Sequence, residues 1–263
     1  MTLLQLFRRP RFSGHSHLVA WRNADVYFLA WKTDFLPPLL EPILWLLAIG
    51  YGLGTFIEDV QGMPYAEFLA PALLTLTALN ASFFECSYGS FVRMYWQKTY
   101  DAIIATPVGL DDVILGELLW AAIKSVINAA IVLGVITAFG LVHSWLILLA
   151  LPVVFVAAFA FGAIGILTTS QAPNIDAFNY PMYLYVTPMW FLSGTFFPLT
   201  DALPPAFHFL AYTFPLTHAT RIARGLNQGL ITDDMLNSFL WLLVVGLVLT
   251  VLSINAMRQR LIK

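Results

Sequence analysis

The sequence predicts an all-α polytopic membrane protein with six transmembrane helices, an N-terminal interfacial helix, and re-entrant helices in the outer leaflet between spans five and six. Apolar residues make up 59% of the 263 positions and charged residues only 11%, less than half of the roughly 25% found in soluble domains. No charged residue occurs from Ser125 to Ile175, from Ala177 to Thr200 or from Met235 to Met257. About 20 apolar residues cross a hydrocarbon core, so these stretches exclude an ordinary soluble enzyme.

The apolar segments divide into six spans of crossing length. The charge-free stretch from Ser125 to Ile175 is too long for one crossing and too short for three, and Gly140, His143 and Ser144 supply its turn. The predicted spans are residues 35–57, 68–92, 113–140, 145–169, 177–197 and 235–257. We treat residues 1–263 as one transmembrane domain, comprising a cytoplasmic and interfacial segment (1–34), the six-span bundle (35–257) and a cytoplasmic tail (258–263).

Lysine and arginine residues gather in the segments that six spans place on one side of the membrane. Ten of them lie on that side, whereas the opposite side has only Arg221 and Arg224. The ten are Arg8, Arg9, Arg11, Arg22, Lys32, Arg93, Lys98, Arg258, Arg260 and Lys263. Because cytoplasmic loops are enriched in these residues, both termini are predicted to lie in the cytoplasm.

The residues from His17 to Phe35 precede the first span and have an amphipathic pattern. Trp21 and Trp31 share one helical face with Phe28 and Phe35, and Arg22 and Lys32 belong to the polar remainder. Tryptophans at headgroup depth beside basic residues are typical of a helix that lies in the membrane plane. A simple lead-in to the first span is the alternative, and the two interpretations are compatible.

The connection between spans two and three contains a candidate short helix, Tyr100–Pro107. Pro107 ends it, because the residue before a proline avoids the α-region. Asp111 then opens the third span at its helix N-terminus. Such a helix, held between two long membrane helices, could transmit a push from a cytoplasmic partner. The alternative is an ordinary loop between spans.

Ionisable and polar groups within the spans are candidate functional residues, because charge is costly in hydrocarbon. Glu41, Glu85 and Glu117 fall toward the cytoplasmic ends, where Arg93, Lys98 or the interfacial helix can pair with them. Lys124 lies about 16 Å into the third span at 1.5 Å per residue, and Asn128 follows one turn later. Lys124 is expected to face either a polar cavity on the substrate path or a carboxylate of another helix in a structural ion pair.

The outer connection between spans five and six, from Pro198 to Asp234, is too apolar to be a solvated loop. Its segment beginning at Pro215 places His218, Arg221 and Arg224 on one helical side. These cations could meet lipid phosphates or an anionic substrate as it leaves. A structural cap on the last external helix is the alternative.

The sequence lacks the common motifs for nucleotide binding and metal binding. It contains no phosphate-cradling G-x-x-x-x-G-K-[ST], no H-E-x-x-H and no Cys/His cluster, so no metal site and no cofactor are expected in this chain. An intramembrane serine protease would have to use Ser193 and His218. These lie in different segments without an orienting acid, so this enzyme class is poorly supported.

Three regions carry a resemblance to a known family. They are Thr99–Pro107 running into Val113–Glu117, then Thr187–Pro198, and finally Leu203-Pro204 followed by Pro215–His218 with Arg224 six residues later. Together with six spans and cytoplasmic termini, they make the chain similar to the membrane subunit of ABC-2 type exporters, and within that family to the nodulation protein J-like permeases.

The resemblance implies partners and roles that composition does not. Two copies of such a permease pair with two copies of a separate ATPase, which binds ATP and Mg²⁺, and no nucleic-acid partner is expected. Tyr100, Asp101, Ile104, Pro107 and Asp111 would belong to the region that couples to the ATPase. Residues 16–33 would be the interfacial helix, and residues 200–230 would re-enter the outer leaflet. Nodulation-type relatives export lipo-chitooligosaccharides, and other relatives export drugs, polysaccharides or lipid-linked glycans.

The function expected is therefore that of the permease subunit of an ATP-driven exporter in the bacterial inner membrane, with an amphipathic, lipid-linked or glycolipid-type substrate. Aromatic residues at span five are candidates for the wall of the path, or alternatively for lipid-facing or packed bulk: Tyr185, Trp190, Phe191, Phe196 and Phe197. The alternative function is a non-transporting membrane anchor or signalling subunit of an ATPase complex. An intramembrane enzyme is the third class.

Overall fold

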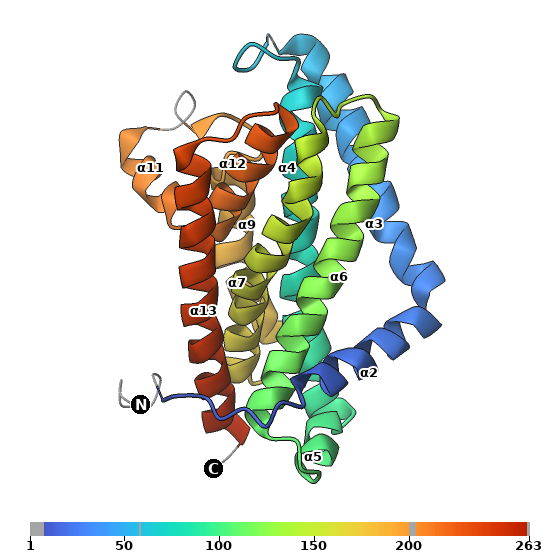
Figure 1. Cartoon of the computed structure of the whole chain (residues 1–263), viewed down its shortest axis with the longest axis vertical. Coiled ribbons are helices and arrows are strands. Elements are labelled where there is room, and N and C mark those ends of the chain that lie inside the picture. Colours follow the sequence, from blue (N-terminus) through green and yellow to red (C-terminus); the bar gives the residue numbers. More distant parts are fainter. Residues whose placement is uncertain (1–7, 58, 200–203, 262–263) are drawn as a thin grey trace.

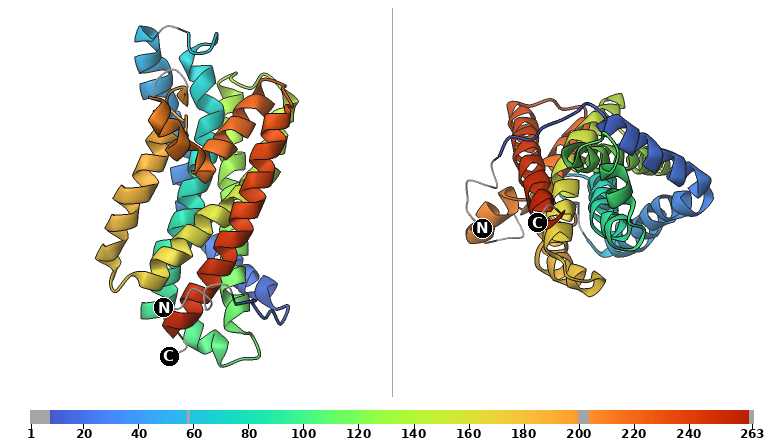
Figure 2. Two further views of the ribbon diagram at one scale, coloured as in Figure 1. Left: turned by 90° about the vertical axis from the view of Figure 1, so that its left-hand side faces the viewer. Right: turned by 90° about the horizontal axis from the view of Figure 1, so that it is seen from below.

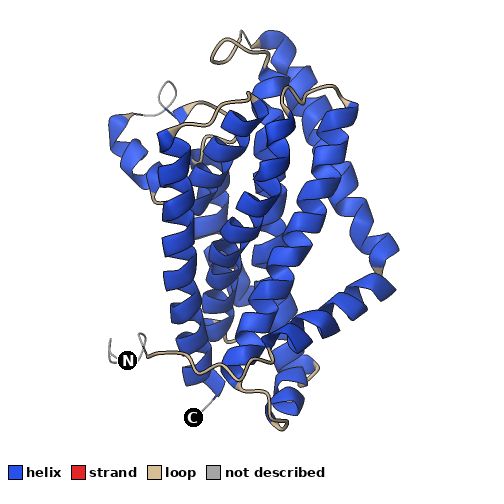
Figure 3. Ribbon diagram, in the orientation of Figure 1, coloured by secondary structure: helices blue, strands red, loops and turns tan. Residues whose placement is uncertain are grey.

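A computed structural model describes residues 8–57, 59–199 and 204–261. All regular elements in these ranges are helical (Figure 3), apart from one isolated bridge between Val60 and Met63. Leu203 of the third motif and Lys263 of the basic tail lie outside the described residues.

Five helices are long and apolar enough to cross a membrane. The first is α3 (Trp31–Trp45), which η1 (Leu46–Gly52) and η2 (Leu53–Phe56) continue, and the second is α4 (Tyr65–Phe84), which η3 (Glu85–Gly89) and η4 (Val92–Trp96) continue. The third is α6 (Leu110–Ala138), and the fourth is α7 (Ala150–Gln171) with η5 (Trp145–Leu149) before it. The fifth is α13 (Asp233–Leu261). Their bounds lie within about four residues of five predicted spans. The chain is therefore a polytopic helical membrane protein, as the sequence predicts.

The predicted fifth span, 177–197, is a shorter helical segment. It consists of η6 (Ile175–Phe178), α8 (Asn179–Pro181), η7 (Met182–Val186) and α9 (Thr187–Leu192). It ends at Leu192 rather than near residue 197. Just beyond Leu192, Gly194 adopts φ +72°, and the backbone turns there. Figure 2 shows this segment rising beside the bundle from the end of α7 toward α11 (Pro205–Tyr212) and α12 (Pro215–Asn227). The count of six crossings remains a prediction.

The bundle has two distinct ends (Figure 1). We call them the α5 end, where α5 (Thr99–Ile104) lies, and the α12 end opposite. At the α5 end the beginning and the end of the described chain meet, because Asn255 Nδ2 donates to the Arg8 carbonyl at 2.8 Å. Both ends of the described part of the chain thus lie on the same side of the bundle.

The N-terminal helix α2 (Ser16–Leu29) stops before the first span begins. Ala30 is not helical (φ −107°, ψ 13°), and its carbonyl accepts the Thr33 hydroxyl at 2.7 Å, which starts α3 in a new direction (Figure 1). The prediction of one interfacial helix over residues 16–33 is wrong in this respect. Trp31 and Lys32 belong to the first turn of α3, whereas Trp21 and Arg22 belong to α2.

Helix α2 crosses the first half of α6 at Gly116, where α6 has no side chain. A Cβ at Gly116 would lie 2.5 Å from the Ser16 carbonyl oxygen and 2.6 Å from Val19 Cβ. Beside this contact, Tyr27 of α2 meets Trp120 edge to face, with ring centroids 5.4 Å apart. The close approach buries one side of α2 and leaves the other exposed, with Trp21 71% accessible.

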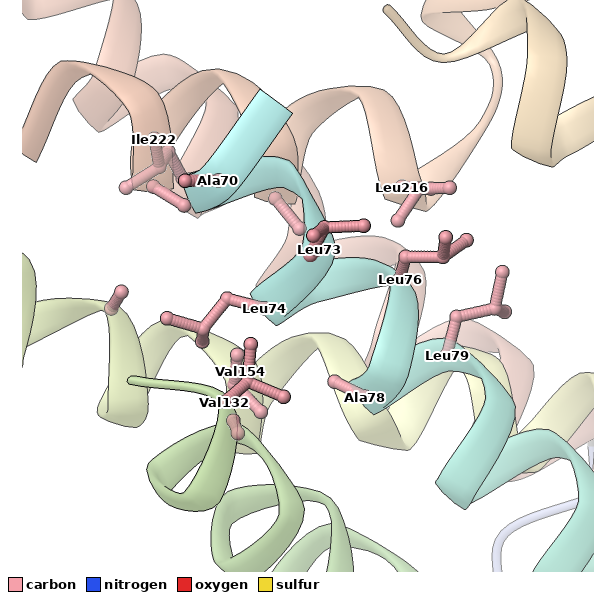
Figure 4. Packing of buried hydrophobic residues seen from close by; sticks show 14 of the residues in the cluster. Ala70, Leu73, Leu74, Leu76, Ala78, Leu79, Val132, Val154, Leu216 and Ile222 are labelled. Atoms are coloured by element: carbon pink, nitrogen blue, oxygen red, sulfur yellow. The ribbon is translucent and has the colours of Figure 1, made fainter. Parts of the chain in front are cut away.

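Helix α4 forms the centre of the core. In Figure 4, Leu74 lies beside Val132 of α6 and Val154 of α7, whereas Ala70 approaches Ile222 of α12. Lower in the bundle α4 and α7 approach closely, and Ser82 Oγ donates to the Ala158 carbonyl at 2.6 Å. In a membrane, where lipid is as apolar as leucine, such small-residue contacts and hydrogen bonds hold helices together.

Substitution of Gly116 by valine is expected to displace α2, because the new Cβ would overlap backbone that cannot move alone. We expect a loss of about 1–3 kcal/mol of stability, measured as a lower melting temperature in detergent, together with faster proteolysis within residues 8–30. Gly134→Val on the same helix is the matched control, since nothing lies within 4 Å of a Cβ at Gly134. Equal behaviour of the two variants would contradict this packing.

Candidate functional site

Helix α5 presents an exposed surface at one end of the bundle. Asp101, Ile104 and Pro107 are exposed, and we call them the coupling surface. The helix runs from Thr99 to Ile104, so it exists where the sequence predicts it but ends before Pro107 rather than at it.

Tyr100 has the opposite environment. Its side chain is fully buried among the residues that join η4, α6 and α7, and burial, followed by the charge of Glu117, raises its pKa. Tyr100 therefore supports α5 from behind. Tyr100 lies in the short helix where the sequence predicts it, but its neighbours cover its side chain completely, so it is not part of the exposed surface.

Asp111 is also withdrawn from the coupling surface. Its carboxylate is 5% exposed, accepts the Arg11 N–H at 2.6 Å and pairs with Arg258 of α13. The neighbouring Asp112 accepts the backbone and hydroxyl of Ser13 at 2.7 and 2.8 Å. The first turn of α6 thus ties both the N-terminal segment and α13 to the bundle. Asp111 links α6 to the N-terminal segment and to α13, and its side chain is not exposed to a docking partner.

Four charged side chains form an ion network. Glu85 and Arg93 come from η3 and η4, which continue α4, and Glu117 and Lys124 come from α6. Arg93 Nη1 donates to Glu85 Oε1 at 2.8 Å, and Arg93 also pairs with Glu117, whose side chain is fully buried. Lys124 Nζ donates to the other oxygen of Glu85, Oε2, at 2.8 Å. Two carboxylates and two cations balance, which is how charge is accommodated in a helical bundle. Nearby Arg22 of α2 is half-buried, and burial lowers its pKa.

A polar pocket of about 360 Å³ lies beside this network. Lys124 and Asn128 line it halfway along α6, and Glu41 lines it from α3. Its remaining lining residues are Asp34, Pro37, Pro38, Thr77, Asn80, Ala81, Phe84, Glu85 and Gly89. Lys124 therefore pairs with a carboxylate of another helix and also lines a polar cavity, and its role on a substrate path remains a prediction. Asn80 and Asp34 were not predicted, although a lone amide one to two turns before Glu85 in an apolar span is a usable signal.

The predicted outer cations of α12 have different partners. His218 stacks on Trp241 of α13 with ring centroids 4.1 Å apart, and Arg221 Nη2 donates to Asp234 Oδ2 at 2.6 Å. Burial lowers the pKa of His218, which donates from Nε2 to the Tyr212 carbonyl at 3.0 Å. Both residues therefore pack toward α13.

Arg224 points into the bundle instead, so the single helical side predicted for these cations is wrong for this residue. Its guanidinium donates to the Phe68 carbonyl at 3.2 Å and the Gly194 carbonyl at 2.9 Å, and lies 3.6 Å from the centre of the Phe68 ring. The side chains at positions 221 and 224 point in directions that differ by about 60° around a helix. The long side chain of Arg224 covers the remaining distance to α4. Pro215, at the start of α12, begins this helix.

The predicted path aromatics gather where α9 and the following turn meet α3. Phe196 lies 5.2 Å from Trp45 and 5.7 Å from Phe191, measured between ring centroids. Phe191 is half exposed, whereas Trp190 and Phe197 are partly buried. Tyr185 packs edge to face on Phe214. None of these five lines the polar pocket, and a role on the path remains a prediction.

Within the described ranges no group of three or more His, Cys, Asp and Glu side chains could hold a metal ion. The site instead combines an exposed short helix at one end, an ion network at its base and a polar pocket within the bundle. Together with the five helices that are long and apolar enough to cross a membrane, these features characterise the chain as a polytopic membrane protein.

Sequence comparison identifies the family. Residues 16–226 match the ABC-2 type transporter family, and the chain belongs to that family. It is 36% identical to nodulation protein J of Rhizobium leguminosarum bv. viciae over 82% of this chain and 83% of the relative, and 34% identical to that of bv. trifolii over 94% of both. It is also 25% identical to the inner membrane transport permease YadH of Escherichia coli K12 over 72% of this chain and 73% of the relative.

Removal of the shared cation tests the ion network. In Arg93→Met the buried Glu117 keeps its charge without its ion-pair partner, and breaking a buried pair in this way costs about 3–5 kcal/mol. We expect a correspondingly large loss of unfolding free energy in a detergent-denaturation titration.

The matched control is Arg221→Met, which removes an ion pair whose side chains are 41% and 66% exposed. Exposed pairs contribute about 0–1 kcal/mol, so this variant should stay close to the parent. A similar loss in both variants would mean that the network does not hold the bundle.

Proposed function

We propose that this chain is the permease subunit of an ATP-driven exporter, and that a separate ABC ATPase binds the coupling surface. The observation that carries the proposal is a contrast in and just after α5: Asp101, Ile104 and Pro107 are exposed, whereas Tyr100 is fully buried. An exposed apolar residue beside a carboxylate suits a protein partner better than solvent. The buried tyrosine links that surface to η4 and α6, so that a push on α5 reaches the membrane helices.

The proposed orientation places the α5 end in the cytoplasm of a bacterium and the chain in the inner membrane. Arg93, Lys98, Arg258 and Arg260 lie at or near that end, whereas the described cations of the opposite end are Arg221 and Arg224. This asymmetry follows the positive-inside rule. The segment 175–192 then serves as the fifth of six crossings, which carries the chain back to the outer leaflet where α11 and α12 lie.

A second copy of the chain is the proposed partner within the membrane. The polar pocket lies at the side of one bundle, and its lining residues Asp34, Glu41 and Lys124 keep part of their surface accessible. A single bundle therefore does not enclose a path. Two copies facing each other, each with its own ATPase, would do so, and an amphipathic substrate such as a lipid-linked glycan is proposed to move between them.

Reversal of charge on the coupling surface tests the ATPase contact. Asp101→Arg and Ile104→Asp should each lower the amount of ABC ATPase that co-purifies with the full chain, about tenfold or more, because each places a wrong charge in a docked interface. The readout is ATPase retained per permease, with the melting temperature of the permease unchanged.

Gln171→Arg is the matched control, since Gln171 is an exposed residue at the end of α7 on the same side of the bundle. Retention of the ATPase by both coupling-surface variants would refute this docking site. Retention of the ATPase by the parent chain without any substrate-stimulated hydrolysis would favour the non-transporting anchor.

A further inference from the structure

A second pocket lies at the α12 end, where α12 packs against both α9 and α13 (Figure 1). It has a volume of about 320 Å³, and we call it the α12 pocket. Ser193 and Gly194 line it from the turn after α9, and Arg221 and Arg224 line it from α12. Among the described residues, none lines both this pocket and the polar pocket beside the ion network. The α12 pocket is therefore a separate site.

The guanidinium of Arg224 carries a charge that no carboxylate of the described residues balances. Nε and Nη2 donate to the Phe68 carbonyl, Nη2 also donates to the Gly194 carbonyl, and Cζ lies 3.6 Å from the centre of the Phe68 ring. Nη1 has no hydrogen-bond partner in the described part of the chain. Carbonyl oxygens and an aromatic face offset a positive charge only in part, and a charge partly withdrawn from water is normally paired. The side chain thus offers an anion both a charge and a donor.

Ser193 adds a buried hydroxyl to the same pocket. The residue is 1% exposed, and its Oγ has no hydrogen-bond partner among the described residues. The next residue, Gly194, accepts a hydrogen bond from Arg224 Nη2 at 2.9 Å, so the turn after α9 and the guanidinium are held together. Buried hydroxyls are nearly always hydrogen-bonded. An unpartnered Oγ beside an unbalanced cation indicates a ligand whose atoms accept hydrogen bonds.

The charge at the α12 pocket is positive. The charged residues of its described lining are Arg221 and Arg224. Arg221 pairs with Asp234, so this pair contributes little net charge, whereas Arg224 remains unbalanced. Asp233 and Asp234 do not line the pocket, and both are exposed, so water and salt weaken their effect. Arg224 therefore sets the sign of the charge, which favours an anion and disfavours a cation.

The distribution of donors favours a phosphate group over a carboxylate. Side chains three residues apart on a helix are neighbours, about 5–6 Å apart at Cβ, so Arg221 and Arg224 reach the pocket side by side, whereas Ser193 reaches it from another element. Arg221 has further N–H groups beside the Nη2 that donates to Asp234. A carboxylate has two oxygens in one plane, whereas the oxygens of a tetrahedral phosphate point to several sides. Arginine is also well suited to phosphate, because its N–H groups form charge-assisted hydrogen bonds to the oxygens.

We propose that the α12 pocket binds a phosphate group, to which Arg224 Nη1 and Ser193 Oγ donate hydrogen bonds while Arg221 supplies a second cation. Free phosphate and the headgroup phosphate of a membrane lipid present the same oxyanion chemistry to this site. The bound group balances the charge of Arg224 and joins the turn after α9 to α12. Binding requires no ATPase and does not depend on which side of the membrane the α12 end faces, so it is separate from the proposed function.

Two binding measurements on the full chain, purified in an uncharged detergent without phosphate or sulfate, test the site and distinguish its two sources. The first is equilibrium binding of radiolabelled inorganic phosphate. The second is native mass spectrometry with phosphatidylglycerol, compared with a diacylglycerol that has the same chains and no phosphate. We expect saturable binding in at least one measurement. The same ligand should raise the melting temperature, because a ligand that binds only the folded protein stabilises it.

Substitutions assign the contact to individual side chains. Ser193→Ala should lower the affinity about tenfold, because one hydrogen bond to an anion is lost, and it removes an Oγ that bonds to no described residue, so the fold should be kept. Arg224→Gln should lower it further, and Ser193→Ala decides the question if Arg224→Gln folds poorly. Ser170→Ala is the matched control, since Ser170 Oγ donates within its own helix α7 at 2.7 Å, and this variant should bind like the parent.

The pattern of binding identifies the source of the phosphate. Phosphate binding that Ser193→Ala weakens supports the site with a free anion as its ligand. Phosphatidylglycerol binding that the same variant weakens, without equal binding of diacylglycerol, supports the site with a lipid headgroup. The site is refuted if neither phosphate nor phosphatidylglycerol binds, or if Ser193→Ala binds both like the parent.

Discussion

The guanidinium of Arg93 lies between two carboxylates that the surrounding helices withdraw from water, and the arrangement of the α5 end depends on it. Glu85 precedes it on the same continuous helix, and Glu117 comes from α6. Because neither charge can be left unpaired in a bundle without a large cost, α4 and α6 are held in one register at this level. The short helix α5 connects these two elements directly, so its position follows from theirs.

Helix α6 connects the features on which the proposals rest. Its first turn binds the N-terminal segment and α13 through Asp111 and Asp112, and Gly116 provides the surface against which α2 packs. Farther along, Glu117 and Lys124 enter the ion network, and Lys124 also reaches the polar pocket. A movement imposed on the start of α6 would therefore reach both α2 and the polar pocket.

The sequence alone predicts the class of fold, the approximate bounds of five spans and the position of α5, because those features depend on composition, charge spacing and a proline. It does not predict the break at Ala30, which depends on one hydroxyl bonding to one carbonyl. Nor does it show that Tyr100 and Asp111 are buried, since burial is a property of the packed bundle. Asn80 stands out in the sequence as an amide within an apolar span, but its place in a pocket shared with α3 and α6 follows only from the packed bundle.

A double-mutant cycle on Arg93 and Glu117 tests the central claim most directly, with unfolding free energies measured by detergent denaturation. Removal of both side chains, as Arg93→Met with Glu117→Leu, leaves Glu85 and Lys124 as a neutral pair. The account predicts that the double variant recovers most of the stability lost in Arg93→Met, with a coupling energy of about 2 kcal/mol or more. Additive losses, with a coupling energy within about 0.5 kcal/mol of zero, would contradict it.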